Sequence, residues 1–146
     1  MKNRVLYVSK GKSENAKKVA DAVAGSARLS ADPVEEHTAI SDLNILFAGC
    51  EVNSSGKIDG TLRKLLQKAD PSQVKLVAVF STSASGTGSA LAEVKSILEP
   101  KGIKVSDTEF FCKGASAFGN KGCPTEDDLN KAKAFAAKII ADAQKA

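Results

Sequence analysis

The sequence has no tryptophan, one tyrosine (Tyr7) and one histidine (His37) among its 146 residues. A single histidine excludes a metal site with several histidine ligands, and we expect His37 in an exposed loop or at a strand edge. The three cysteines are odd in number and form no CxxC pair, so neither a disulfide framework nor a zinc site is predicted. Cys112 and Cys123 could still meet across a loop, whereas Cys50 is interpreted as a small buried residue.

Long apolar runs are also missing. The first run stops after Val8, which is too short for the core of a signal peptide, and no later run approaches a membrane span. We therefore expect a cytoplasmic protein without a membrane partner. The net charge of +4 comes from 21 basic and 17 acidic residues, with lysines scattered and not interleaved with aromatics. This pattern does not favour nucleic-acid binding, and the length fits one domain over 1–146.

Apolar runs of strand length alternate with amphipathic segments along the chain. Strands are predicted over 4–9, 43–49 and 74–81, with a longer, more alternating edge strand over 103–114. Only a short strand, around 34–38, is expected in the segment 26–40. Helices are predicted over 15–25, 59–70, 88–102 and 124–143. This alternation is typical of an α/β fold with a parallel sheet covered by helices on both faces.

Local signals place the ends of these helices. Gly25 is a plausible stop for the first helix, and Asp59 is a possible N-cap for the second. Thr125 and Asp128 resemble a capping box at the start of the last helix.

Three loops should carry the function, because parallel α/β sheets bind ligands beyond the carboxyl ends of their strands. The loops 9–16, 50–58 and 81–88 read SKGKSENA, CEVNSSGKI and STSASGTG. Their small polar residues let backbone N–H groups approach a ligand, and the first loop adds the positive end of a helix dipole. The same residues also serve in turns and caps. Three such loops at one edge favour a phosphate-bearing ligand.

Three stretches resemble the flavodoxin-like family: RVLYVSKGKSENAKKVADAVA (4–24), ILFAGCEVNSSGKIDGTLRKLL (45–66) and EFFCKGASAFGNKGCPTEDDLNKAKAFAAKI (109–139). The resemblance implies a three-layer, doubly wound, five-stranded parallel sheet of order 2-1-3-4-5. It implies FMN as the cofactor, with its phosphate in 9–16 and its isoalloxazine between the other two loops.

The resemblance assigns FMN contacts to three groups of residues. They are Ser9, Lys10, Gly11, Lys12, Ser13, Glu14, Asn15 and Ala16, then Glu51, Val52, Asn53, Ser54, Ser55, Gly56 and Lys57, and finally Ser81, Thr82, Ser83, Ala84, Ser85 and Gly86.

The chain departs from the family pattern in its first loop and in its aromatics. Glu14 stands where the phosphate loop has glycine, and Ala16 stands where it has threonine. A carboxylate at Glu14 would repel a phosphate unless it turns outward, while nearby lysines and Ser13 compensate. Asn53 occupies the position expected to stack on the flavin, because Tyr7 is expected in the core. Phe118 could approach the site but is expected to anchor its loop.

Two other proteins of the same topology are excluded. A response-regulator receiver needs carboxylates at the ends of the first and third strands, where this chain has Ser9–Lys10 and Cys50–Glu51. A small tyrosine phosphatase or arsenate reductase needs C-x5-R, but the residue six positions after Cys50 is Gly56.

Two functions stay open. The chain is either an FMN-binding electron carrier that exchanges electrons with a partner reductase, or an accessory docking subunit that binds FMN weakly or not at all. No residue stands out as a catalytic acid or base, so enzyme activity is left undecided. The positive rim formed by Lys10, Lys12, Lys57 and Lys113 would suit a partner with an acidic docking face.

Overall fold

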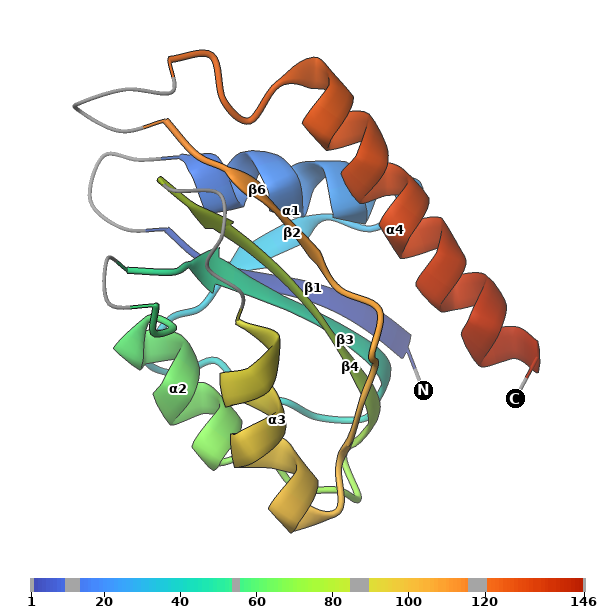
Figure 1. Cartoon of the computed structure of the whole chain (residues 1–146). Helices are drawn as coiled ribbons and strands as arrows, with labels where there is room; N and C mark the ends of the chain where they lie inside the picture. Colours follow the sequence, from blue (N-terminus) through green and yellow to red (C-terminus); the bar gives the residue numbers. More distant parts are fainter. Residues whose placement is uncertain (1, 10–13, 54–55, 85–89, 116–120, 146) are drawn as a thin grey trace.

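A parallel β-sheet lies between two layers of helices in the computed structural model (Figure 1). The structure describes residues 2–9, 14–53, 56–84, 90–115 and 121–145. The strands are β1 (Lys2–Val8), β2 (Ala31–Pro33), β3 (Leu43–Glu51), β4 (Val74–Ser83), β5 (Lys104–Val105) and β6 (Phe110–Lys113). The helices are α1 (Asn15–Ser26), α2 (Gly60–Gln67), α3 (Leu91–Leu98) and α4 (Glu126–Lys145), with a 3-10 turn, η1 (Glu99–Lys101), after α3.

The strand order is β2-β1-β3-β4-β5, and every pairing is parallel. This confirms the order that the family resemblance implied. The strand expected over 103–114 is wrong as a single element, because the chain leaves β4 after Val105 and returns at Phe110. β5 and β6 therefore lie one after the other along the edge of β4, where a single fifth strand was expected. In the bend between them, the Ser106 hydroxyl accepts a hydrogen bond from the Thr108 N–H at 3.1 Å.

The edge strand β2 lies earlier than predicted. It spans Ala31–Pro33 and not the residues around 34–38. The later residues fold back on themselves instead, because the Glu35 N–H bonds the Thr38 hydroxyl at 2.8 Å and the Thr38 N–H bonds the Glu35 carbonyl at 3.1 Å. Proline at the end of β2 is tolerated because the strand is at the sheet edge.

The two faces of the sheet bury separate apolar clusters. Helices α1 and α4 cover one face, where Phe47 and Phe135 meet edge to face with centroids 6.1 Å apart. Helices α2 and α3 cover the other, around Leu46, Leu62 and Leu66. Strands β3 and β4 are apolar over most of their length because both of their faces are buried. Among the described residues, no helix is both long and apolar enough to cross a bilayer.

The predicted helix ends are largely confirmed. Asp59 caps α2, since its carboxylate accepts the Thr61 N–H at 2.8 Å. Helix α1 continues past Gly25 to Ser26, and Arg28 takes the left-handed conformation after it, with φ 59°. At the start of α4 the Thr125 N–H bonds Asp128 Oδ2 at 2.9 Å, and the Asp128 N–H bonds Thr125 Oγ1 at 3.1 Å. These reciprocal bonds form the predicted capping box.

Replacing Thr125 with alanine should lower the free energy of unfolding by about 1 kcal/mol, because the Asp128 N–H loses its acceptor. Urea denaturation measures this change. Thr125→Ser is the matched control, because it keeps the hydroxyl and should retain most of the stability. An equal loss in both variants would show that the threonine methyl, and not the capping bond, stabilises this end of α4.

Candidate functional site

The ends of β1, β3 and β4 bring the three predicted loops to one edge of the sheet. In the register of the strands, Val8 lies beside Cys50 and Cys50 lies beside Ser81. The loops follow directly, and the Val52 N–H donates to the Thr82 carbonyl at 2.8 Å. Of the predicted contacts, Lys10, Gly11, Lys12, Ser13, Ser54, Ser55, Ser85 and Gly86 lie outside the described residues, as does Phe118.

The first turn of α1 has features that suit an anion. Glu14 is the N-cap residue, but its exposed side chain makes no capping hydrogen bond. The first turn holds no acidic residue. Ser9 is exposed at the end of β1, while Ala16 is buried and its side chain packs inward. The exposed N-terminal N–H groups of such a helix attract a phosphate.

Asn15 joins three segments of the chain at this edge. Its amide nitrogen donates to Glu51 Oε1 at 2.7 Å and to the Ala115 carbonyl at 2.9 Å, and its amide oxygen accepts the Ala115 N–H at 3.1 Å. The side chain is buried, with 4% of its surface exposed. Asn15 was predicted to contact FMN. The structure shows its side chain linking the start of α1, the end of β3 and the segment after β6.

Gly114 is the neighbour that makes this arrangement possible. A Cβ at position 114 would lie 2.5 Å from the Asn15 amide nitrogen and 2.8 Å from its Cγ. The Gly114 N–H also donates to the Ser83 carbonyl at 3.0 Å, so the backbone cannot easily move away. Gly114 was not among the residues predicted for the site, although it lies in the stretch 109–139 that resembles the flavodoxin-like family.

The second loop closes on itself through Asn53. Its side-chain oxygen accepts the Lys57 N–H at 3.0 Å, and its carbonyl accepts the Gly56 N–H at 2.9 Å. Gly56 has φ 80°, a left-handed conformation that side chains disfavour. Asn53 and Lys57 are exposed, whereas Val52 is buried under the loop.

A polar brace fixes the far end of this loop against both helices of the adjacent face. Glu93 on α3 accepts the Ile58 N–H at 2.9 Å and the Arg63 Nε–H at 2.8 Å. Arg63 on α2 also donates to the Ile58 carbonyl at 3.1 Å. The second loop is therefore anchored at its start by β4 and at its end by α2 and α3.

The third loop leaves β4 through three buried polar residues. Ser81 and Thr82 have no exposed surface, and within the described part of the chain neither hydroxyl has a hydrogen-bond partner. Ser83 is 6% exposed, and Ala84 follows at the surface. Buried hydroxyls without partners cost stability, and a buried water is the usual way in which such groups are satisfied.

All three cysteines are free thiols in this structure. Burial raises the pKa of Cys50 to about 11 and that of Cys112 to about 12. Both are held as neutral thiols at neutral pH, which confirms the interpretation of Cys50 as a buried residue. His37 is exposed beside Glu35, and Tyr7 is buried in the core, as expected.

The arrangement fits FMN in three respects. The start of α1 has no side-chain cap from Glu14 and can receive a phosphate. The Ser81 and Thr82 hydroxyls, unpartnered in the described part of the chain, lie near the end of β4, and Gly56 permits either orientation of its peptide. An aromatic ring for stacking is missing from the described residues of these three loops.

Asn15→Ala should lower the free energy of unfolding by about 1–3 kcal/mol, because the three hydrogen bonds of the buried Asn15 amide to Glu51 and to the half-buried Ala115 backbone are lost. Gly114→Ala should also destabilise, and it should cost less in the Asn15→Ala background, where the amide no longer opposes the new Cβ. A double-mutant cycle in urea measures this coupling. Asn130→Ala, on the exposed side of α4, is the matched control. Strictly additive losses would contradict the close contact.

No protein-family model and no curated protein matches this chain. Solved structures do. A flavodoxin from the domain Archaea is similar over 99% of both chains, with a TM-score of 0.75 and 19% identity. A Streptococcus pneumonia TIGR4 flavodoxin matches 97% of this chain and 99% of its own, with a TM-score of 0.70 and 16% identity. Rubredoxin oxygen:oxidoreductase from Desulfovibrio gigas matches 99% of this chain but 36% of its own, with a TM-score of 0.74 and 18% identity. These likenesses, together with the strand order, show that the chain has the flavodoxin-like α/β fold.

Proposed function

We propose that this protein binds FMN at the carboxyl edge of its sheet and carries electrons to or from a partner reductase. The observation that supports it best is the N-terminus of α1, where the N-cap residue Glu14 makes no side-chain capping bond and which lies beside the ends of β3 and β4. When bound, FMN supplies one- and two-electron redox chemistry. The chain's own residues bind its phosphate, exclude water and offer backbone groups to its ring.

Each segment has a distinct task in this proposal. The start of α1, with the segment 9–16, holds the phosphate through backbone N–H groups. The loop that Asn53 closes presents the peptide of Gly56 to the ring, and its left-handed conformation leaves that peptide free to reorient. Asn15 positions the first of these segments against β3 and the chain after β6, so it acts on the ligand indirectly.

The proposal predicts that FMN fluorescence is quenched on titration with the protein and that the quenching saturates at micromolar FMN. Riboflavin should bind at least about tenfold more weakly, because it lacks the phosphate that the helix N-terminus attracts. Asn15→Ala should weaken FMN more than riboflavin, since it loosens the phosphate segment, and Asn130→Ala should change neither.

The docking subunit remains a second candidate, and two observations favour it. Tyr7 is buried, and Asn53 at the expected stacking position uses its side chain to close its own loop. An absence of quenching at high FMN would rule out the electron carrier and leave the docking subunit. Equal affinity for FMN and riboflavin would instead refute the phosphate site.

The partner in this proposal has an acidic docking face. Lys57 and Lys113 are exposed at the carboxyl edge, next to the proposed flavin site. The rate of electron exchange with a reductase that has an acidic face should therefore fall as ionic strength rises from about 50 to 300 mM. Stopped-flow measurements with Lys113→Gln, which should flatten this dependence, test the contribution of the rim. A rate that does not depend on salt would contradict it.

A further inference from the structure

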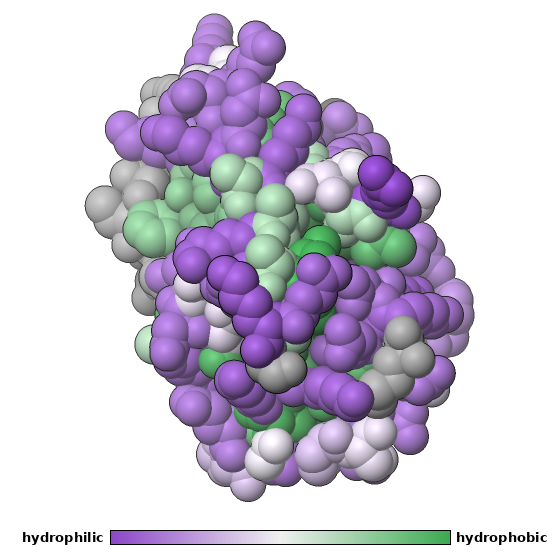
Figure 2. Space-filling view, turned by 90° about the vertical axis from the view of Figure 1, so that its right-hand side faces the viewer, coloured by the Kyte–Doolittle hydropathy of each residue, from purple (hydrophilic) through white to green (hydrophobic). Residues whose placement is uncertain are grey.

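A hollow in the surface lies at the opposite end of the sheet from the proposed flavin site. It has a volume of about 480 Å³ and is bounded by the first residues of β3 and β4, by β5 and the bend after it, and by the last turns of α4. This volume is within the range of about 300–1,000 Å³ that small-molecule sites occupy. Figure 2 looks onto the side of the molecule where α4 ends and shows apolar surface among hydrophilic side chains.

The break in the fifth strand creates this hollow. β5 pairs with β4 at only two positions, after which the chain bends away until β6. Helix α4 packs on α1 and β6, so its last turns extend past β5 without a long strand beneath them. The space between α4 and the sheet is left open there.

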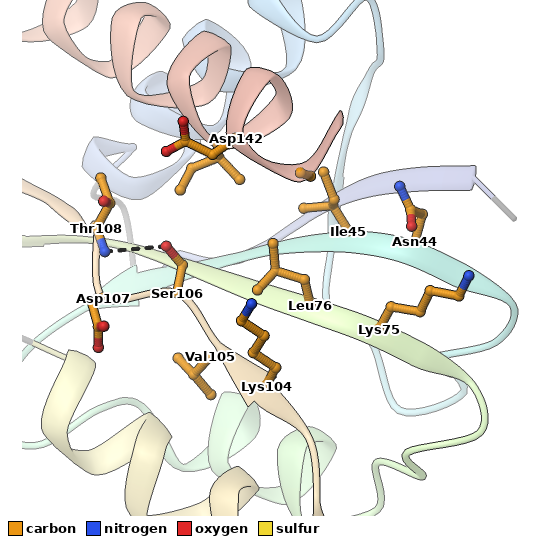
Figure 3. A pocket seen from close by; sticks show the side chains of 12 residues that line it. Asn44, Ile45, Lys75, Leu76, Lys104, Val105, Ser106, Asp107, Thr108 and Asp142 are labelled. Atoms are coloured by element: carbon orange, nitrogen blue, oxygen red, sulfur yellow. Dashed lines mark hydrogen bonds between the residues drawn. The ribbon is translucent and has the colours of Figure 1, made fainter. Parts of the chain in front are cut away.

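The floor of the hollow is apolar. Ile45 and Leu76 line it from the sheet, and Ile139 and Ala143 line it from α4. Figure 3 shows Ile45 and Leu76 facing the space beneath α4. Removing a hydrocarbon chain from water onto such a floor contributes about 0.8 kcal/mol for each buried CH₂ group.

The charges of the rim favour an anion. Both rim carboxylates already have cationic partners, because Asp107 pairs with Lys95 and Asp142 pairs with Lys138 at 3.0 Å. In Figure 3 the Asp107 carboxylate points away from the hollow. Lys75 and Lys104 make no hydrogen bond or ion pair with any described residue. Lys95, and to a smaller extent Lys104, lowers the pKa of Asp107. The four lysines at and beside the rim (Lys75, Lys95, Lys104 and Lys138) outnumber its two carboxylates, so the charge there is net positive.

The side chain of Lys104 brings a positive charge into the hollow itself. Its side chain extends toward the middle of the space in Figure 3, near Leu76 and Ser106. The Ser106 hydroxyl accepts a bond from the Thr108 N–H and keeps its own proton to donate. An ammonium and a hydroxyl donor above an apolar floor match a carboxylate attached to a hydrocarbon body.

We propose that this hollow binds a small amphipathic carboxylate, with its hydrocarbon chain between α4 and β4 and its carboxylate at Lys104 and Ser106. The site is separate from the proposed flavin site, and its occupancy does not depend on FMN. The binding step is non-covalent and needs no cofactor.

Octanoate is the probe, and ¹H–¹⁵N NMR of the full chain is the measurement. Octanoate should shift the amide signals of Lys104–Thr108 and of the last turns of α4, with half-saturation at or below about 1 mM. Octanol, which has the same chain without the charge, should bind about fivefold more weakly, as expected for one partly exposed ion pair. Saturating the protein with FMN should leave the octanoate affinity unchanged.

Two variants separate the charge from the apolar floor. Lys104→Gln should weaken octanoate about fivefold and leave octanol unchanged, whereas Lys68→Gln, an exposed lysine on the other face, should change neither. Ala143→Phe should fill the space and weaken both ligands at least tenfold, with circular dichroism confirming the fold. No shifts at 10 mM octanoate, or shifts confined to the loops at the carboxyl edge, would overturn the site. Equal affinities for octanoate and octanol would overturn the role of Lys104.

Discussion

The pairing of β3 with β1 on one side and with β4 on the other is the constraint on which the rest of the molecule depends. β3 is buried on both faces and bonded along both edges, so its register fixes where its neighbours end. Because all three strands are parallel, their carboxyl ends coincide. Loops that begin about 30 to 70 residues apart in sequence are thereby brought to one edge by the pairing of the strands.

At the carboxyl edge of the sheet, Asn15 was expected to contact FMN, but its side chain instead holds three segments of the protein together. Asn15 is at the start of α1, yet its amide bonds Glu51 and Ala115 instead of facing outward. A buried amide with all of these bonds is strongly position-specific, because a side chain of another shape or polarity could not make all three at once. The phosphate contacts in this protein would then come from backbone N–H groups and from residues of the segment 9–14. The affinity for the FMN phosphate would then depend less on side-chain contacts than on the rigidity with which the start of α1 is positioned.

The lack of aromatic side chains in the three loops affects how the isoalloxazine ring of FMN would bind. Two stacking contacts are each worth about 0.5–1.5 kcal/mol beyond burial, so their absence weakens a flavin by roughly one to two orders of magnitude. The unpartnered hydroxyls of Ser81 and Thr82 offset part of this loss if the bound ligand or its water satisfies them. The FMN affinity that results from these two effects decides between an electron carrier and a docking subunit.

Structural features that depend on residues close together in the sequence were predicted correctly. The apolar runs of β3 and β4, the stripe of α1 and the caps at Asp59 and Thr125 all depend on residues a few positions apart, and they were predicted. The position of β2 was predicted wrongly because a three-residue edge strand, with a half-buried alanine followed by exposed Asp32 and Pro33, carries almost no pattern. The break between β5 and β6 could not be predicted, since an alternating sequence continues through it. The bond from Asn15 to Ala115 joins residues 100 positions apart, which no local pattern reveals.

Helix α4 lies next to both candidate sites, and this sets how the two sites could communicate. It begins beside the segment after β6, where the Ala115 N–H meets the Cys123 carbonyl at 3.1 Å, and its last turns cover the hollow at Lys104. β3 and β4 also run between the sites, but their packing on both faces resists a small displacement. A rigid-body shift of α4 across β6 and α1 would move apolar contacts without breaking sheet hydrogen bonds. Because such a shift requires a ligand to favour one position of α4 over another, a ligand that fits the hollow as it stands leaves the carboxyl edge unchanged.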